Sequence, residues 1–171
     1  MKRSTFAPLV ILILTAIVVT TSTSAAIVPE HGPSAFGAGQ FTYRNPSTER
    51  LERWRFSFEA IANKNGQARG RAHFENLTAQ TQVVVRINCL NVASGINLNA
   101  GMIGTVLHSD DPRFPKLTTV DFAAMDGPWL PLFGSDTITP LFEFPFPELD
   151  CSYAQPLTIL PVEDGDIQIQ P

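Results

Sequence analysis

The sequence predicts an all-β chain, folded as a single antiparallel β-barrel or β-sandwich of about 7–9 short strands. Apolar and polar side chains alternate over several stretches, most clearly from Trp54 to Ala60, and this period of two is that of a strand with one buried face. The 11 glycines and 14 prolines among 171 residues disfavour long helices. Beyond the first 26 residues no stretch repeats apolar residues with the period of a helix.

The start of the chain, residues 1–26, is expected to be a signal peptide rather than part of the fold. Two basic residues precede an apolar run from Phe6 to Val19, and small residues up to Ala26 follow it. This order is that of a secretory signal, and the run is shorter than the roughly 20 residues of a membrane anchor. We therefore predict cleavage near Ala26, a secreted protein, either extracellular or periplasmic, and no transmembrane segment after cleavage.

The mature chain is expected to begin with a flexible lead-in, residues 27–34, before a β-domain over residues 35–171. A valine-rich run at 81–92 is apolar on both faces, which is typical of a central strand or one covered on both sides. Prolines make 137–149 an edge strand or extended coil. The other strands are expected at 35–43, 54–60, 68–75, 96–107, 117–125, 157–162 and 166–170, with loops at 108–116 and 126–136.

The turn between the second and third strands fixes a register. A two-residue loop, Asn65-Gly66, would set Phe58 opposite His73 and mix the two faces of the hairpin. A three-residue loop over 64–66 keeps the faces matched, and a one-residue slip would invert a whole strand. We therefore predict the three-residue loop, with Gly66 in the left-handed conformation. It pairs Phe56 with Phe74, Phe58 with Ala72, Ala60 with Gly70, Arg55 with Glu75 and Glu59 with Arg71.

Cys89 and Cys151 are the two cysteines of the chain. In an oxidising compartment thiols pair, and two cysteines allow one intramolecular bridge. The sequence therefore predicts a Cys89–Cys151 disulfide, and two buried free thiols are the alternative. Neither cysteine belongs to a CxxC motif, which argues against a redox or zinc role.

Charge is unevenly distributed along the chain. The 12 basic and 16 acidic residues give a formal charge of −4, which argues against a nucleic acid as partner because its phosphates would be repelled. Residues 41–86 hold eight basic and four acidic side chains, whereas residues 108–171 hold two and eleven. Folding is expected to interleave the two halves into an ordinary mixed surface, and the alternative is a functional asymmetry.

Motifs of the common enzyme classes are missing. The sequence holds no GxSxG, HExxH, GxxxxGK[ST] or GxGxxG, and His31, His73 and His108 lie far apart in it. We therefore expect a non-enzymatic binding or structural module at or outside the cell envelope, with no cofactor. The alternative is a small secreted hydrolase whose dispersed site uses His108 and loop aspartates.

Acidic residues in the loops suit Ca²⁺, which takes six to eight oxygen ligands. Their spacing does not match a twelve-residue calcium loop, so ordinary solvated turn residues are the preferred interpretation. The residues concerned are Asp110, Asp111, Asp126, Asp136, Glu163, Asp164 and Asp166.

A protein or glycan partner would be expected to contact the loop at 126–136. This loop carries Trp129, Leu130, Leu132 and Phe133 between prolines and glycines, and aromatic side chains on a stiff loop are typical interface anchors. The favoured alternative is that the loop folds back and buries Trp129, because four large apolar side chains seldom stay exposed in a monomer. Separately, Asn76 begins a glycosylation sequon, which matters only in a eukaryotic source.

Six short motifs occur one after another along the chain. They are Gly37-Ala38-Gly39-Gln40-Phe41, Phe56-Ser57-Phe58, Asn65-Gly66 before Gly70, Cys89-Leu90-Asn91-Val92, Asp126-Gly127 with Asp136, and Asp164-Gly165-Asp166-Ile167-Gln168-Ile169. Over most of residues 35–170 this order resembles a family of secreted bacterial β-rich domains labelled post-COAP. The resemblance implies export, β architecture and a bacterial source, and it transfers no catalytic residue. The chain departs from the family pattern at Pro128-Trp129.

Overall fold

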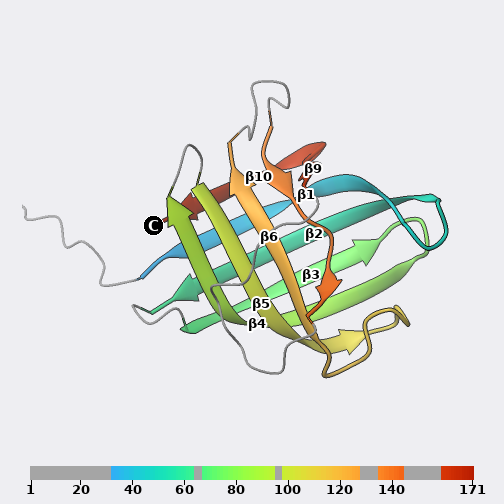
Figure 1. Cartoon of the computed structure of the whole chain (residues 1–171), viewed down its shortest axis with the longest axis horizontal. Coiled ribbons are helices and arrows are strands. Elements are labelled where there is room, and N and C mark those ends of the chain that lie inside the picture. Colours follow the sequence, from blue (N-terminus) through green and yellow to red (C-terminus); the bar gives the residue numbers. More distant parts are fainter. Residues whose placement is uncertain (1–31, 64–66, 95–97, 128–134, 145–158) are drawn as a thin grey trace, which may run out of the picture.

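The computed structural model describes residues 32–63, 67–94, 98–127, 135–144 and 159–171. Over these residues the chain is all-β, with ten strands in one antiparallel sheet (Figure 1). The described part contains no helix of a length and apolarity that would cross a membrane. The strands are β1 (Ser34–Arg44), β2 (Leu51–Ala62), β3 (Gln67–Asn76), β4 (Thr81–Ser94), β5 (Leu98–Ser109), β6 (Thr119–Asp126), β7 (Thr137–Ile138), β8 (Phe142–Glu143), β9 (Leu160–Pro161) and β10 (Asp164–Gln170).

The strand order confirms the predicted fold class. Along the sheet it is β10-β1-β2-β3-β4-β5-β6-β7-β9, and β8 pairs with β6. Neighbours in the chain are mostly neighbours in the sheet, as tight turns between antiparallel strands require. The sheet curls over itself without closing into a barrel, so β5 and β6 cross β2 and β3 in Figure 1. The strands β1 to β6 are 8–14 residues long, longer than expected.

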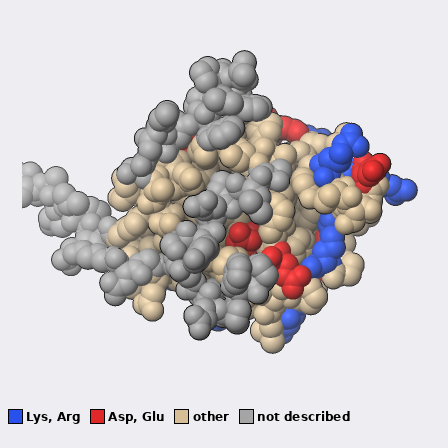
Figure 2. Space-filling view, in the orientation of Figure 1, with Lys and Arg blue, Asp and Glu red and all other residues tan. Residues whose placement is uncertain are grey.

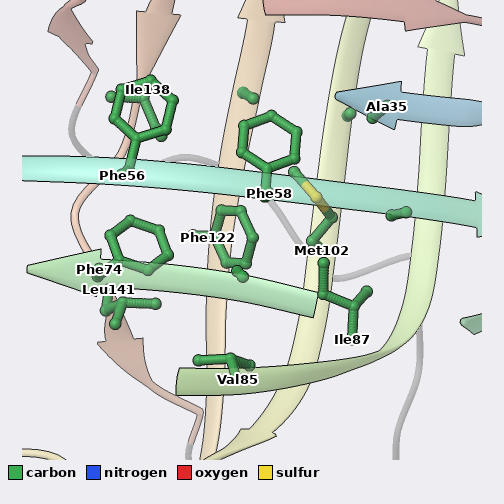
Figure 3. Packing of buried hydrophobic residues seen from close by; sticks show 14 of the residues in the cluster. Ala35, Phe56, Phe58, Phe74, Val85, Ile87, Met102, Phe122, Ile138 and Leu141 are labelled. Carbon is green, nitrogen blue, oxygen red and sulfur yellow. The ribbon is translucent and has the colours of Figure 1, made fainter. Parts of the chain in front are cut away.

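The core lies between the two layers of this curled sheet. Phe122 on β6 contacts Phe58 on β2 and Phe74 on β3, with ring centroids 5.7 and 5.1 Å apart. Both contacts are edge-to-face, the arrangement that aromatic quadrupoles favour. Because β6 does not pair with β2 or β3, these rings join the layers directly (Figure 3).

The predicted hairpin register is confirmed. Phe56 lies opposite Phe74, and Phe58 lies opposite Ala72. On the exposed face Arg55 lies opposite Glu75, and their side chains form an ion pair at 3.0 Å. The backbone of Asn63 donates to the carbonyl of Gln67 at 2.9 Å, which closes the hairpin around three residues. Gly66 itself lies outside the described residues.

A bulge in β4 brings residues of both parities to the main core. The register with β5 shifts between Ile87 and Cys89, so both Ile87 and Leu90 reach the main core, since an extra residue reverses the parity of a strand. Cys89 instead packs with Ile103 and Phe144 in a second buried cluster. β4 is therefore covered on both sides around Cys89 and Leu90, whereas Arg86 lies exposed on its outer face.

Two aspartates hold the edge of β10 that faces away from β1. The backbone N–H of Ile167 donates to Asp136 Oδ2 at 2.7 Å, and that of Ile169 donates to Asp126 Oδ2 at 3.1 Å. Asp136 also accepts from Gly127 N through Oδ1 at 2.9 Å. We call these contacts the seam, because they join β10 to the β6–β7 side of the sheet where no strand ladder exists. Unpaired edge N–H groups are thereby satisfied.

Asp136→Ala should open the seam beside Ile167. Each N–H that loses its acceptor costs about 1–3 kcal/mol where it is shielded from water. We expect a lower free energy of unfolding and faster amide hydrogen exchange at Ile167, with Ile169 little changed. Asp126→Ala should instead speed amide exchange at Ile169 and leave Ile167 little changed.

Asp166→Ala is the matched control for the seam, because Asp166 is exposed on β10 and its carboxylate accepts from Gln168. It should change stability by no more than about 0.5 kcal/mol. Unaltered exchange at Ile167 in the Asp136 variant would contradict the role given to the seam.

Candidate binding surface and the end cluster

One end of the molecule carries the β1–β2, β3–β4 and β5–β6 turns together (Figure 1). The inward-facing positions of β2 and β3 change there from apolar to polar. Glu52 continues the inward stripe of Trp54 and Phe56, and Asn76 continues that of Phe74. Their side chains are buried, with exposures of 9% for Glu52 and 0% for Asn76.

Arg113, from the β5–β6 loop, reaches across this end. Its Nη1 donates to Glu52 Oε2 at 3.0 Å, while its Nη2 donates to Asp111 Oδ2 at 2.7 Å and its Nε to Asp111 Oδ1 at 2.9 Å. The guanidinium also lies 5.4 Å from the centroid of the Trp54 ring, within the range of a cation–π contact. Arg113 therefore ties two carboxylates from different elements to the top of the core. We call Asn45, Glu52, Trp54, Asn76, Asp111 and Arg113 the end cluster.

Both carboxylates of the end cluster are held in the ionised form. Burial raises the pKa of Glu52, but hydrogen bonds from Asn45, Arg113 and Trp54 outweigh it and hold that pKa below its usual range. Burial likewise raises the pKa of Asp111, and its contacts with Arg113 and Thr81 reverse the shift. Hydrogen bonding to Asp111 raises the pKa of Arg113. Neither acid is poised to exchange a proton near neutral pH, so the end cluster has the chemistry of a structural closure.

Asn76 belongs to this closure. Its Nδ2 donates to Glu52 Oε2 at 2.8 Å, and its Oδ1 accepts from the backbone N–H groups of Thr78 and Ala79 at 3.0 Å. Asn76 is fully buried, and its Nδ2, the atom to which a glycan would be attached, donates to a buried carboxylate. The folded protein therefore leaves no room for the glycan that the sequon allows, and the residue has a structural role instead.

The exposed faces of β1 to β4 carry a different kind of site. Their outward residues form a row across the sheet, in which Phe36 lies opposite Glu59, Glu59 opposite Arg71, and Arg71 opposite Arg86. Arg69 lies two residues from Arg71 on β3. Neighbouring strands are about 4.8 Å apart, and alternate residues of one strand about 6.7 Å. We call these five residues the arginine face.

The arginine face holds more positive charge than its acids neutralise. Arg71 and Arg86 are like charges in directly opposed positions, an arrangement that destabilises a sheet. In the described parts of the chain Arg69, Arg71 and Arg86 form no ion pair. Two rows away, by contrast, Arg55 and Glu75 close theirs at 3.0 Å.

Shallow grooves cross this side of the described sheet, and two of them bear on the arginine face and its surroundings. The first is lined by Phe36, Glu59, Ile61, Arg69 and Arg71, with Ala60 and Gly70 at its floor. A side chain at Gly70 is excluded, because a Cβ there would lie 2.1 Å from the carbonyl oxygen of Glu59. The second groove is lined by Gln40, Arg55, Ser57, His73 and Asp164, among others.

The histidines do not assemble a hydrolytic site with the loop aspartates. His73 and His108 both lie opposite Val84, on its two sides, and are therefore two strands apart. Ser57 lies opposite His73, but the Nε2 of His73 contacts Gln82 at 3.1 Å. Among the described residues no three His, Cys, Asp or Glu side chains gather as metal ligands do.

The loop carboxylates proposed for Ca²⁺ mostly have other partners. Asp110 accepts from the backbone of Gln82, Asp111 binds Arg113, and Asp126 and Asp136 form the seam. Burial also raises the pKa of Asp121, an acid on β6 that the sequence had not singled out. Outside the described residues lie the predicted signal peptide, the loop residues Trp129, Leu130, Leu132 and Phe133, and Cys151.

Sequence reasoning missed the two residues that organise the end cluster. Glu52 had a detectable signal, since it shares the parity of Trp54, Phe56 and Phe58 and so had to face inward. Arg113 had none, because loop residues follow no period. The expectation that folding mixes the basic and acidic halves of the chain holds for part of the surface. Both signs of charge gather at the turn-bearing end on the face shown in Figure 2, as an ordinary mixed surface would, but the arginine face departs from that expectation.

Arg113→Met should destabilise the protein by about 3 kcal/mol at pH 7, because it leaves two buried carboxylates without their cation. This is the low end of the range for such losses, since the side chain of Arg113 is 36% exposed. Arg55→Met, which breaks an exposed ion pair, should cost less than about 1 kcal/mol. Chemical denaturation of both variants gives the comparison.

The cost of Arg113→Met should also depend on pH. The folded pKa values of Glu52 and Asp111 lie below the ordinary 4.5 and 3.8. Their contribution to stability is therefore complete above those values and is lost as pH falls through the lower, folded ones. The difference in the free energy of unfolding between wild type and Arg113→Met should become smaller below about pH 4.5. A gap that stays constant down to pH 2 would mean that these ionised pairs do not stabilise the fold.

Comparisons with known proteins give no relative of this chain. No family model, no curated protein and no solved structure matches it. The resemblance to the post-COAP family stays a prediction.

Proposed function

We propose that the protein is an exported, non-enzymatic β-domain that acts as a binding module at or outside the cell envelope, with the arginine face as its contact surface. The observation that carries this proposal is Arg71 opposite Arg86, with no acid paired to either in the described chain. Like charges held together on a rigid sheet attract an anion. A purely structural module would gain nothing from this arrangement.

The acids of the end cluster and the seam favour binding over hydrolysis. A hydrolase needs a carboxylate or histidine that exchanges protons near the pH of the reaction. Glu52 and Asp111 are held ionised by Arg113, while Asp126 and Asp136 accept backbone N–H groups. His108 lies exposed on β5 and lines neither groove described above. The proposal therefore includes no catalytic residue and no cofactor.

Export and a Cys89–Cys151 bridge belong to the same proposal. Cys89 faces the second cluster, where it packs with Phe144. Cys151 follows Phe144 by seven residues, and seven extended residues reach about 23 Å. The chain is therefore long enough to return Cys151 to Cys89. A bridge that closes a loop of about 60 residues stabilises a fold by roughly 4 kcal/mol on the chain-entropy model.

Peptide mapping of the exported protein, without reduction, tests both expectations. We expect an N-terminus at or next to Ile27 and one cross-linked peptide that joins Cys89 to Cys151. Reduction should lower the melting temperature, and Cys89→Ala should lower it similarly. Recovery of intact Met1 would refute cleavage, and alkylation of both cysteines in the folded, unreduced protein would refute the bridge.

Co-sedimentation of the mature protein with an envelope preparation of the producing cells tests binding. We expect retention that weakens as salt rises, because exposed ion pairs are screened, and Arg71→Gln with Arg86→Gln should release the protein. Arg44→Gln is the matched control, since it removes an exposed arginine from the turn-bearing end. Retention that is indifferent to the Arg71 and Arg86 substitutions would refute this surface as the binding site.

A further inference from the structure

Two pairs of opposite charges lie across β2 and β3, and only one of them forms an ion pair. Glu59 and Arg71 are directly opposed across β2 and β3, just as Arg55 and Glu75 are. The second pair closes at 3.0 Å, whereas no ion pair joins Glu59 to Arg71. Both residues line the groove over Ala60 and Gly70 instead. A pair that stays open across a groove leaves a donor and an acceptor for a ligand.

The side chains around this groove form a mixed set. Arg69 and Arg71 supply planar forks of donors that match a carboxylate in bidentate geometry. Glu59 supplies an acceptor for hydroxyl groups, and Phe36, which is 37% exposed, supplies an apolar edge. A six-membered sugar ring that bears a carboxylate presents these same three features: an anion, several hydroxyls and an apolar face.

We propose that this groove binds the uronic acid units of an acidic polysaccharide, a conclusion that rests on the proposed function and names its ligand. Arg69 and Arg71 bind the carboxylate, Arg86 adds positive charge beside Arg71, and Glu59 accepts from a ring hydroxyl. The polymer lies across the strands, because the groove is bounded by two rows that run across the sheet.

The charges on the same face argue against a nucleic acid. Asp164 and Asp166 on β10 are exposed, and they lie opposite Gln40 and Ala38 in the rows beside the groove. Duplex DNA carries a charge about every 1.7 Å of its axis, so its phosphates would meet these carboxylates and Glu59. A polyuronate carries one carboxylate on each ring, and its hydroxyls donate to acids.

The composition of the face argues against a protein partner. Stable protein interfaces have an apolar core with large buried anchors. Among the described residues, three large hydrophobic side chains have more than a third of their surface exposed: Phe36, Leu51 and Leu117. Of these, Phe36 alone lines the groove. A rigid, polar and shallow groove suits an extended polymer better than a folded partner.

Titration calorimetry of the full mature protein with oligogalacturonate tests the proposal. We expect measurable binding that weakens with salt. The substitutions Arg69→Gln and Arg71→Gln should each weaken it about tenfold or more, since a charge-assisted hydrogen bond contributes about 1.5–3 kcal/mol. Phe36→Ala should weaken it less. Arg55→Gln, on the same sheet face but outside this groove, should leave binding unchanged.

Stability provides a second readout that separates recognition from folding. Arg71→Gln removes a like-charge contact with Arg86, so its melting temperature should stay the same or rise. Neutral dextran should not bind, and duplex DNA and dextran sulfate should bind more weakly than oligogalacturonate. Equal binding of all three polyanions would overturn the carboxylate assignment, as would binding that survives Arg69→Gln and Arg71→Gln.

The two proposals fail in distinguishable ways. Salt-sensitive envelope retention that needs Arg71 and Arg86, combined with no affinity for oligogalacturonate, overturns the uronic acid assignment and leaves the binding function standing. Loss of both overturns both.

Discussion

The fold depends on how the free edge of β10 is satisfied. A curled sheet that does not close has two edges, and each presents unpaired N–H and C=O groups. Here Asp136 and Asp126 accept from Ile167 and Ile169, on the side of β10 that faces away from β1. Two side chains thus replace part of a strand ladder, and β10 covers one side of the core with Ile167 and Ile169 buried beneath it.

The seam and the end cluster each cover groups that the curled sheet would otherwise leave exposed or unpaired. At the seam, backbone donors on the edge of β10 would be left unpaired beside β6 and β7. At the turn-bearing end, Trp54 and Phe114 would face solvent without a cover, and Arg113 lies over both rings at 5.4 and 5.8 Å. At the end cluster, Asp111 and Arg113 from the C-terminal half of the chain meet Glu52 from the N-terminal half, whereas at the seam Asp126 and Asp136 hold a strand from their own half. Neither group of acids is then available for chemistry.

Local patterning was enough to predict the strands and the first hairpin. Alternation in β2 and β3 fixed both faces, and the charges of Arg55 and Glu75 selected among the possible registers, because these signals depend on neighbouring strands alone. Long-range contacts carried no such signal. Nothing near Asp136 in sequence indicates Ile167 as its partner, and the sequon at Asn76 pointed to a glycan although the residue's parity places it inside. Arg71 and Arg86 also lie on neighbouring strands, but the turn between β3 and β4 was assigned no register from the sequence, so their pairing was not predicted.

The uneven charge along the chain has a physical consequence once the fold is known. Residues 108–171 hold eleven acids and two bases, yet Asp111, Asp126 and Asp136 are engaged in the end cluster and the seam. The basic excess of residues 41–86 has no equivalent interior use, because alternation places Arg69, Arg71 and Arg86 on the exposed side of β3 and β4. A chain with a formal charge of −4 therefore carries a locally basic face. Net charge alone would argue against an anionic partner. The distribution of charge over the folded sheet instead fits the acidic polysaccharide proposed above, whose anions are spaced far enough apart to avoid the acids on the same face.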